Sequence, residues 1–120
     1  MDKPAILCVD DTPAVLHTTE LILRAANYTV STAAIAGDAL RLLRSKHFDL
    51  ILLDCIPEHQ SVVQEAKRVN PDVSVVVFTG NPALRDVPLV DRVLCKPVPP
   101  PALLDEIAEL LSSRVAKIAA

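Results

Sequence analysis

The chain has 120 residues, which suits one domain, and 51% of them are hydrophobic, so an intrinsically disordered protein is excluded. A net charge of -3 and only 2% aromatic residues argue against direct binding to nucleic acid, which needs basic surfaces or stacking side chains. No apolar run has the length of a membrane span, and Met1–Pro4 does not open a signal peptide. We expect a single domain over residues 1–120 in the cytoplasm, with no membrane contact.

The first third of the chain predicts a strand, a helix and a second strand. Ala5–Val9 is uniformly apolar, as expected of a strand buried on both faces, and it leads into Asp10 and Asp11. The Thr-Pro pair that follows is typical of a helix start, and Asn27 is expected to end the helix. Tyr28–Ala33 alternates and predicts a half-covered strand near a sheet edge. The apolar face of the helix is predicted to contain Val15, Ile22 and Ala26.

The middle of the chain carries its most uniform apolar stretch. Leu50–Leu53 shows no polar alternation, which predicts the central strand of a parallel sheet, and Asp54 follows it directly. Apolar residues at helical spacing predict a helix on either side of this strand. They are Ala36, Leu40 and Leu43 before the strand, and Val62, Ala66 and Val69 after it.

The last part of the chain predicts two further strands and a closing helix. Val73–Phe78 and Asp91–Cys95 are the strands, and they lead into Thr79 and Lys96 respectively. Two prolines in the intervening residues 81–90 predict a poor, reduced helix there. The closing helix is expected to turn these apolar residues inward: Leu103, Ile107, Leu110 and Leu111.

Strands and helices alternate through the chain, and this order determines the expected fold class. It predicts an α/β protein with a doubly wound, five-stranded parallel sheet of the (βα)5, flavodoxin-like type, strand order 2-1-3-4-5, and a reduced fourth helix. In such sheets the carboxyl ends of the strands meet at one edge, where ligands bind. The polar residues that follow the strands are therefore expected to surround one pocket.

The chemistry of these residues suits a phosphoryl group and a cation. Asp10, Asp11 and Asp54 would repel one another, and a divalent cation relieves that repulsion. Oxygen ligands on an open site favour Mg²⁺ over zinc. Lys96 adds a positive charge and Thr79 a hydroxyl donor, which together with a metal is what a bound phosphoryl group requires. Asp54 is the expected nucleophile.

The ordered set of strand-end residues resembles the receiver domain of bacterial two-component response regulators, over essentially the whole chain. The set comprises Asp10, Asp11, Asp54, Thr79, Lys96 and Pro97. The resemblance implies that Asp54 accepts a phosphoryl group from a phosphohistidine of a histidine kinase or a histidine phosphotransfer protein. The protein would then be a switch that changes its binding to an unknown downstream protein, and not an enzyme.

The resemblance also implies roles for the other residues of the site. Thr79 and Lys96 would contact the phosphoryl group, and the Lys96–Pro97 peptide bond would be cis. Asp11 and Asp54 would bind Mg²⁺ directly, Asp10 would assist through a water molecule, and the backbone carbonyl of Ile56 would be the third protein ligand.

Three features depart from the pattern of the family. Pro57 comes one position early after Asp54, and no glycine follows before the next helix, so the loop must turn differently. Val93 stands where the family usually has an aromatic residue, and the interval between Thr79 and Lys96 is short. We expect phosphorylation to move mainly the backbone after Thr79 and residues 81–90.

Two rival functions remain at this point. The altered loop and the missing aromatic residue suit a protein-docking module that keeps the fold without using phosphorylation. An acidic site with Asp54 as nucleophile also suits a Mg²⁺-dependent phosphohydrolase, although no insertion is present that would form a substrate pocket. The cysteines lack C-x-x-C spacing and predict reduced thiols, buried at Cys8 and Cys95 and nearer solvent at Cys55. His59 is expected to be a surface residue.

Overall fold

The computed structural model describes residues 3–54, 56, 58–80 and 88–119, with side chains as far as residue 113. Five parallel strands form one sheet in the order β2-β1-β3-β4-β5, and this confirms the predicted order 2-1-3-4-5. The elements are β1 (Ala5–Val9), α1 (Pro13–Ala25), β2 (Thr29–Ala33), α2 (Ala36–Ser45), β3 (Leu50–Asp54), α3 (His59–Val69), β4 (Ser74–Thr79), β5 (Arg92–Cys95) and α4 (Pro100–Ala119).

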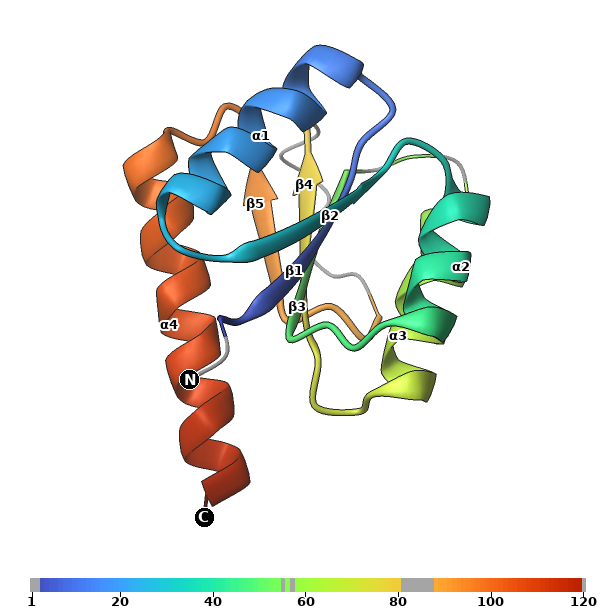
Figure 1. Ribbon diagram of the computed structural model, residues 1–120, viewed down its shortest axis with the longest axis vertical. Helices are drawn as coiled ribbons and strands as arrows, with labels where there is room; N and C mark the ends of the chain where they lie inside the picture. Colours follow the sequence, from blue (N-terminus) through green and yellow to red (C-terminus); the bar gives the residue numbers. More distant parts are fainter. Residues whose placement is uncertain (1–2, 55, 57, 81–87, 120) are drawn as a thin grey trace.

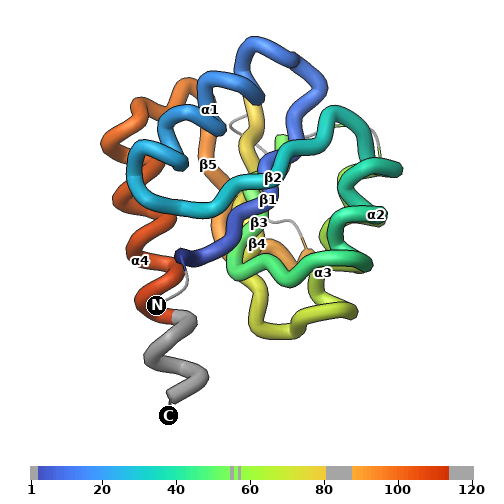
Figure 2. Tube along the Cα trace, in the orientation of Figure 1, coloured from blue at the N-terminus to red at the C-terminus, as the bar shows by residue number. Residues whose placement is uncertain are grey.

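The sheet is the middle of three layers. Helices α1 and α4 cover one of its faces, and α2 and α3 cover the other (Figure 1). Figure 2 follows the same arrangement as a continuous trace, with the blue α1 and orange α4 on one side and the green α2 and α3 on the other. This is the doubly wound architecture that the alternation of strands and helices predicted. No helix in the described ranges is both long and apolar enough to cross a membrane.

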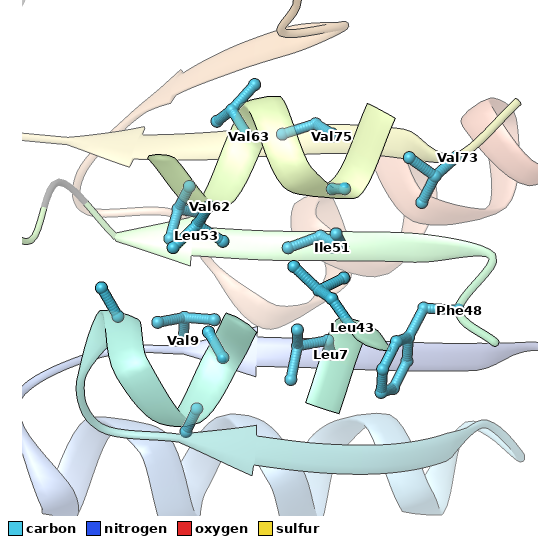
Figure 3. Packing of buried hydrophobic residues seen from close by; sticks show 14 of the residues in the cluster. Leu7, Val9, Leu43, Phe48, Ile51, Leu53, Val62, Val63, Val73 and Val75 are labelled. Carbon is cyan, nitrogen blue, oxygen red and sulfur yellow. The ribbon is translucent and has the colours of Figure 1, made fainter. Parts of the chain in front are cut away.

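Strand β3 is central because its side chains supply both hydrophobic cores. Ile51 and Leu53 point to the core under α2 and α3, where they meet residues of β1, β4 and both helices (Figure 3). Leu50 and Leu52 point to the core under α1 and α4. Each of the four is at most 2% exposed, and burying such a side chain contributes about 1.5–3 kcal/mol. Burial on both faces explains why the strand shows no polar alternation.

The predicted inward face of α1 is wrong for two of its three residues. Leu23 is the fully buried residue of this helix, and Leu16 packs partly against the same core. Of the predicted residues, Ile22 is half-buried, Val15 is 44% exposed and Ala26 is exposed. The cause is that α1 has apolar residues on more than one side, so helical spacing permits two faces. The packing of α1 against the sheet turns the face with Leu16 and Leu23 inward.

The other helix faces are partly as predicted. In α4 the predicted Leu103, Ile107 and Leu110 are buried, and Leu111 packs partly against them. In α2 and α3 the small or β-branched residues Ala39 and Val63 are buried, in addition to the predicted residues Ala36, Leu43, Val62 and Ala66. The predicted Leu40 is only half-buried and Val69 is 40% exposed, because both lie at the margin of the stripe that faces the sheet.

A network of hydrogen bonds holds the start of β5 against β4. The Asp91 backbone N–H donates to the Val75 carbonyl at 2.9 Å, and the Asp91 carboxylate accepts from the Val75 N–H at 2.7 Å. Lys67 of α3 reaches the same carboxylate at 3.0 Å and the Val73 carbonyl at 2.7 Å. These bonds set the register of β5 and hence the position of the residues at its other end.

The cysteine prediction holds for one residue and fails for another. Cys8 is buried in β1, and burial first, then the charges of Glu20 and Asp10, raises the pKa of its thiol to about 12. Cys95 is exposed, contrary to prediction, because β5 is the edge strand. Cys55 and the predicted reduced helix, which falls largely on residues 81–87, lie outside the described residues.

Candidate functional site

The strands bring the predicted site residues to one edge of the sheet. Asp10 follows β1, and Asp54 and Thr79 are the last residues of β3 and β4. Thr79 pairs with Cys95 across the sheet, so the next residue, Lys96, lies beside it, and the Lys96 N–H donates to the Thr79 carbonyl at 2.8 Å. Parallel pairing of the strands therefore brings these residues together at one edge of the sheet, as predicted from the sequence.

Three carboxylates converge at this edge. One oxygen each of Asp10, Asp11 and Asp54 lies within 4.8 Å of the other two. Asp10 is only 8% exposed, and burial is the main reason that its pKa is raised, with the negative charges of Asp54 and Asp11 adding to it. A hydrogen bond of 2.9 Å from the Thr12 N–H to Asp10 Oδ1 and the charge of Lys96 oppose this increase.

Lys96 forms an ion pair with Asp54. Its Nζ lies 2.6 Å from Asp54 Oδ1. Although burial lowers the pKa of Lys96, the hydrogen bond and charge of Asp54 outweigh it, and the charges of Asp10 and Asp11 also contribute, so the pKa is raised. Lys96 therefore stays cationic and faces all three acids. The Lys96–Pro97 peptide bond is cis, as the resemblance implied.

The three acids fit a hard divalent cation. All the side-chain donors are carboxylate oxygens, the ligands that Mg²⁺ and Ca²⁺ prefer. One lysine leaves two negative charges of the three uncompensated, and the charges of Asp54 and Asp11 add to the effect of burial in raising the pKa of Asp10. A bound cation would remove this repulsion. Thr79, buried at the end of β4, supplies a hydroxyl at the same edge.

The loop after Asp54 has a conformation that the sequence analysis did not predict. The Ile56 N–H donates to the Asp54 carbonyl at 2.7 Å, and the Ile56 side chain is buried in the core. The Ile56 carbonyl, predicted to be a metal ligand, accepts a hydrogen bond of 3.2 Å from the His59 N–H. His59 Nδ1 lies 3.2 Å from the same oxygen, so this histidine is a half-buried loop contact and not a surface residue. One feature of the sequence points to this contact: His59 lies three residues after Ile56, at the start of α3.

A hollow of about 400 Å³ lies next to the acids. Asp11 and Ile56 line it together with Glu58 and residues 34–37, which connect β2 to α2 and form the first turn of α2. Ile35, a large apolar residue of its wall, is 59% exposed. Asp11 and Ile56 thus belong to one concave surface.

Glu58 carries backbone strain, which predicts a stabilising substitution. Its φ of 64° lies in the left-handed region, which costs a non-glycine residue about 1–2 kcal/mol. Glu58→Gly is expected to raise the free energy of unfolding by about 0.5–1 kcal/mol, because part of the relief is lost to the greater entropy of glycine in the unfolded chain. Urea denaturation measures this change. The control, Gln64→Gly on the exposed side of α3, is expected to lower stability by about 1 kcal/mol.

The raised pKa of Asp10 predicts a pH-dependent gain from Asp10→Asn in metal-free solution. A carboxyl with a raised pKa in the folded state destabilises the fold while it is ionised, so the substitution is expected to stabilise the protein by about 1–2 kcal/mol at neutral pH. As the pH falls below the pKa of Asp10 in the folded protein, the wild-type carboxyl becomes protonated and the destabilisation is lost. The gain from the substitution should therefore shrink as the pH approaches the ordinary pKa of Asp. Chemical denaturation at several pH values in a chelator tests this, and a gain that does not depend on pH would contradict it.

Comparison with known proteins agrees with this arrangement. The family model described as "Response regulator receiver domain" matches residues 6–108. The chain is similar to a solved CheY-like receiver domain protein from Methanospirillum hungatei JF-1, with 30% identity, a TM-score of 0.89, and coverage of 97% of this chain and 99% of that one. A receiver protein from Sinorhizobium medicae WSM419 is 27% identical, with a TM-score of 0.82 and coverage of 93% and 97%.

The curated relatives are longer proteins. The transcriptional regulatory protein GlrR of Escherichia coli (strain K12) is 30% identical over 118 residues, which cover 91% of this chain and 27% of that protein. ZraR of Salmonella typhimurium is 34% identical over 81 residues, covering 65% of this chain and 18% of that protein. The chain thus spans about a quarter or less of the length of these two relatives.

Proposed function

The chain belongs to the response regulator receiver domain family, and on this premise we propose that Asp54 accepts a phosphoryl group from a phosphohistidine. The donor would be a histidine kinase or a histidine phosphotransfer protein. An oxygen of the Asp54 carboxylate would form the new P–O bond while the P–N bond of the donor breaks, and its electron pair returns to the donor imidazole. The phosphoryl group is transferred to the protein itself, and its later loss restores the free Asp54. The protein would therefore act as a switch and not as an enzyme with a separate substrate.

The observation that carries this proposal is the ion pair of Lys96 with Asp54 beside two further acids. Lys96 Nζ, 2.6 Å from Asp54 Oδ1, lies where an oxygen of a phosphoryl group on Asp54 would need a positive charge. The Thr79 hydroxyl, at the end of the adjacent strand β4, would donate to another phosphoryl oxygen. A lysine that already contacts the nucleophile needs little movement to follow the charge onto the phosphoryl group.

Asp10, Asp11 and Asp54 are the residues that would hold Mg²⁺, with the Ile56 carbonyl as a further ligand. When bound, Mg²⁺ supplies positive charge that neutralises the acids and the phosphoryl oxygens. The carboxylates of Asp10 and Asp11 would position that charge beside Asp54. Asp10 is itself held by the Thr12 N–H, so its orientation does not depend on the metal.

The output of the switch would be a change in binding to another protein or to another domain of a longer chain. GlrR and ZraR are named as transcriptional regulatory proteins, so an output that acts on DNA through a separate domain is one form this could take. The receiver domain itself carries a net charge of -3, which does not favour direct contact with DNA.

Incubation with acetyl phosphate and Mg²⁺, followed by intact-mass measurement, tests the proposed function. We expect the mass of one phosphoryl group to be added, and the gain to disappear when a chelator replaces Mg²⁺. Absence of any gain under both conditions would instead support a docking module that does not use phosphorylation. Release of phosphate from many substrate molecules per protein would support a phosphohydrolase.

A further inference from the structure

The carbonyl oxygen of Ile56 has two hydrogen-bond donors in the structure, both from His59. The backbone N–H of His59 and the ring atom Nδ1 each lie 3.2 Å from it. A carbonyl oxygen has two lone pairs, so both are occupied. This is the same oxygen that the proposed function assigns to Mg²⁺.

The proton on the His59 ring can be assigned from its second contact. Nε2 lies 3.4 Å from Gln60 Nε2, an amide nitrogen that only donates, so the ring must accept there. The neutral tautomer with its proton on Nδ1 satisfies both contacts. The ring therefore donates to the Ile56 carbonyl.

The two donors differ in how easily they can leave. The His59 N–H belongs to the first residue of α3 and closes the turn at Glu58, so breaking that bond would open the backbone turn that leads into the helix. The imidazole can leave by rotation about its side-chain bonds, which costs one neutral hydrogen bond. The Ile56 side chain is only 3% exposed and packs in the core, so moving this residue costs more than rotating the ring.

We propose that the His59 imidazole competes with the metal ion for the Ile56 carbonyl, and so sets the affinity of the site for Mg²⁺. The inference rests on the proposed function, in which this carbonyl is a metal ligand. Mg²⁺ binds at short range with near-ideal geometry and tolerates little competition for a ligand lone pair. His59 is thus a positioning residue. Without metal its ring holds the Ile56 carbonyl, and when Mg²⁺ binds, the ring releases that carbonyl.

Two variants separate the donor from the ring. His59→Phe keeps a ring of similar shape and removes the donor, so it is expected to bind Mg²⁺ about three- to tenfold more tightly than wild type, the effect of one side-chain hydrogen bond. His59→Asn places an amide nitrogen near the position of Nδ1 and is expected to restore affinity close to that of wild type. The probe is Mg²⁺ alone, titrated at one fixed pH and followed by backbone amide signals of the three acids in NMR spectra.

The proposed release of the Ile56 carbonyl by His59 can also be observed directly in the wild-type protein. The Nδ1–H proton of His59 is expected to give a resolved signal in metal-free protein, and to shift or exchange with water when Mg²⁺ saturates the site. An unchanged Nδ1–H signal at saturation, or equal Mg²⁺ affinity in wild type and His59→Phe, would overturn the inference and leave the proposed function standing. If Mg²⁺ fails to bind to wild type and to both variants, the proposed metal site fails, and the inference fails with it.

Discussion

Asp54→Asn is expected to abolish the gain of a phosphoryl group from acetyl phosphate completely. Asn has the shape of Asp, but its neutral amide is not a nucleophile toward phosphorus, so the acyl phosphate cannot form. The substitution also removes the charge that Lys96 Nζ contacts at 2.6 Å. Intact mass after incubation with acetyl phosphate and Mg²⁺ measures the effect directly, because each added phosphoryl group is counted.

The control for this experiment is Asp105→Asn, which removes an exposed acid of α4. It is expected to be phosphorylated as fully as wild type, since it changes the net charge by the same amount away from the site. A phosphoryl group retained by Asp54→Asn would show that another carboxylate is the acceptor. Asp10 and Asp11 are the nearest candidates, and peptide mapping would distinguish them.

Leu23→Ala is expected to lower the free energy of unfolding by about 3–5 kcal/mol. Leu23 has no exposed surface and packs in the core between the sheet and α1 and α4, so its truncation removes buried apolar area and leaves a cavity. A loss of this size is a large part of the stability of a domain of this length, about 5–15 kcal/mol. Urea denaturation should show a lower midpoint with an unchanged slope.

Leu21→Ala is the matched control, because it makes the same chemical change two residues away on the same helix. Leu21 is 55% exposed, and the expected loss is below about 0.5 kcal/mol. Similar losses in the two variants would mean that α1 does not present Leu23 to the core. A large loss in Leu21→Ala alone would mean that the helix is rotated relative to the sheet.

The strands and the residues at their ends could be predicted from the sequence. Leu50–Leu53 is apolar on both sides, as expected of a strand buried on both faces, and the acid that follows such a strand lies at the carboxyl edge. The same reasoning places Asp10, Thr79 and Lys96 at that edge, where the structure has them. Such predictions succeed because successive side chains of a strand point to opposite faces of the sheet, and because parallel pairing aligns the ends of the strands.

The contacts that determine how the site works depended on the tertiary structure. The loop from Asp54 to His59 contains no regular pattern, so its turn at Glu58 and the double contact of His59 with Ile56 come from packing of Ile56 in the core. Likewise, the ion pair between Lys96 and Asp54 joins residues 42 positions apart, and only the pairing of β3, β4 and β5 brings them together.

By itself, the sequence determined the order of elements, the central strand and the set of polar residues at the strand ends. The inward face of α1 and the donors on the Ile56 carbonyl were decided only by the tertiary structure. The physical reason is the distance along the chain over which each feature is determined. The periodicity of a strand or helix depends on a few neighbouring residues and can be recognised from residue type. The orientation of a helix and the contacts of a loop depend on which surfaces meet across the fold.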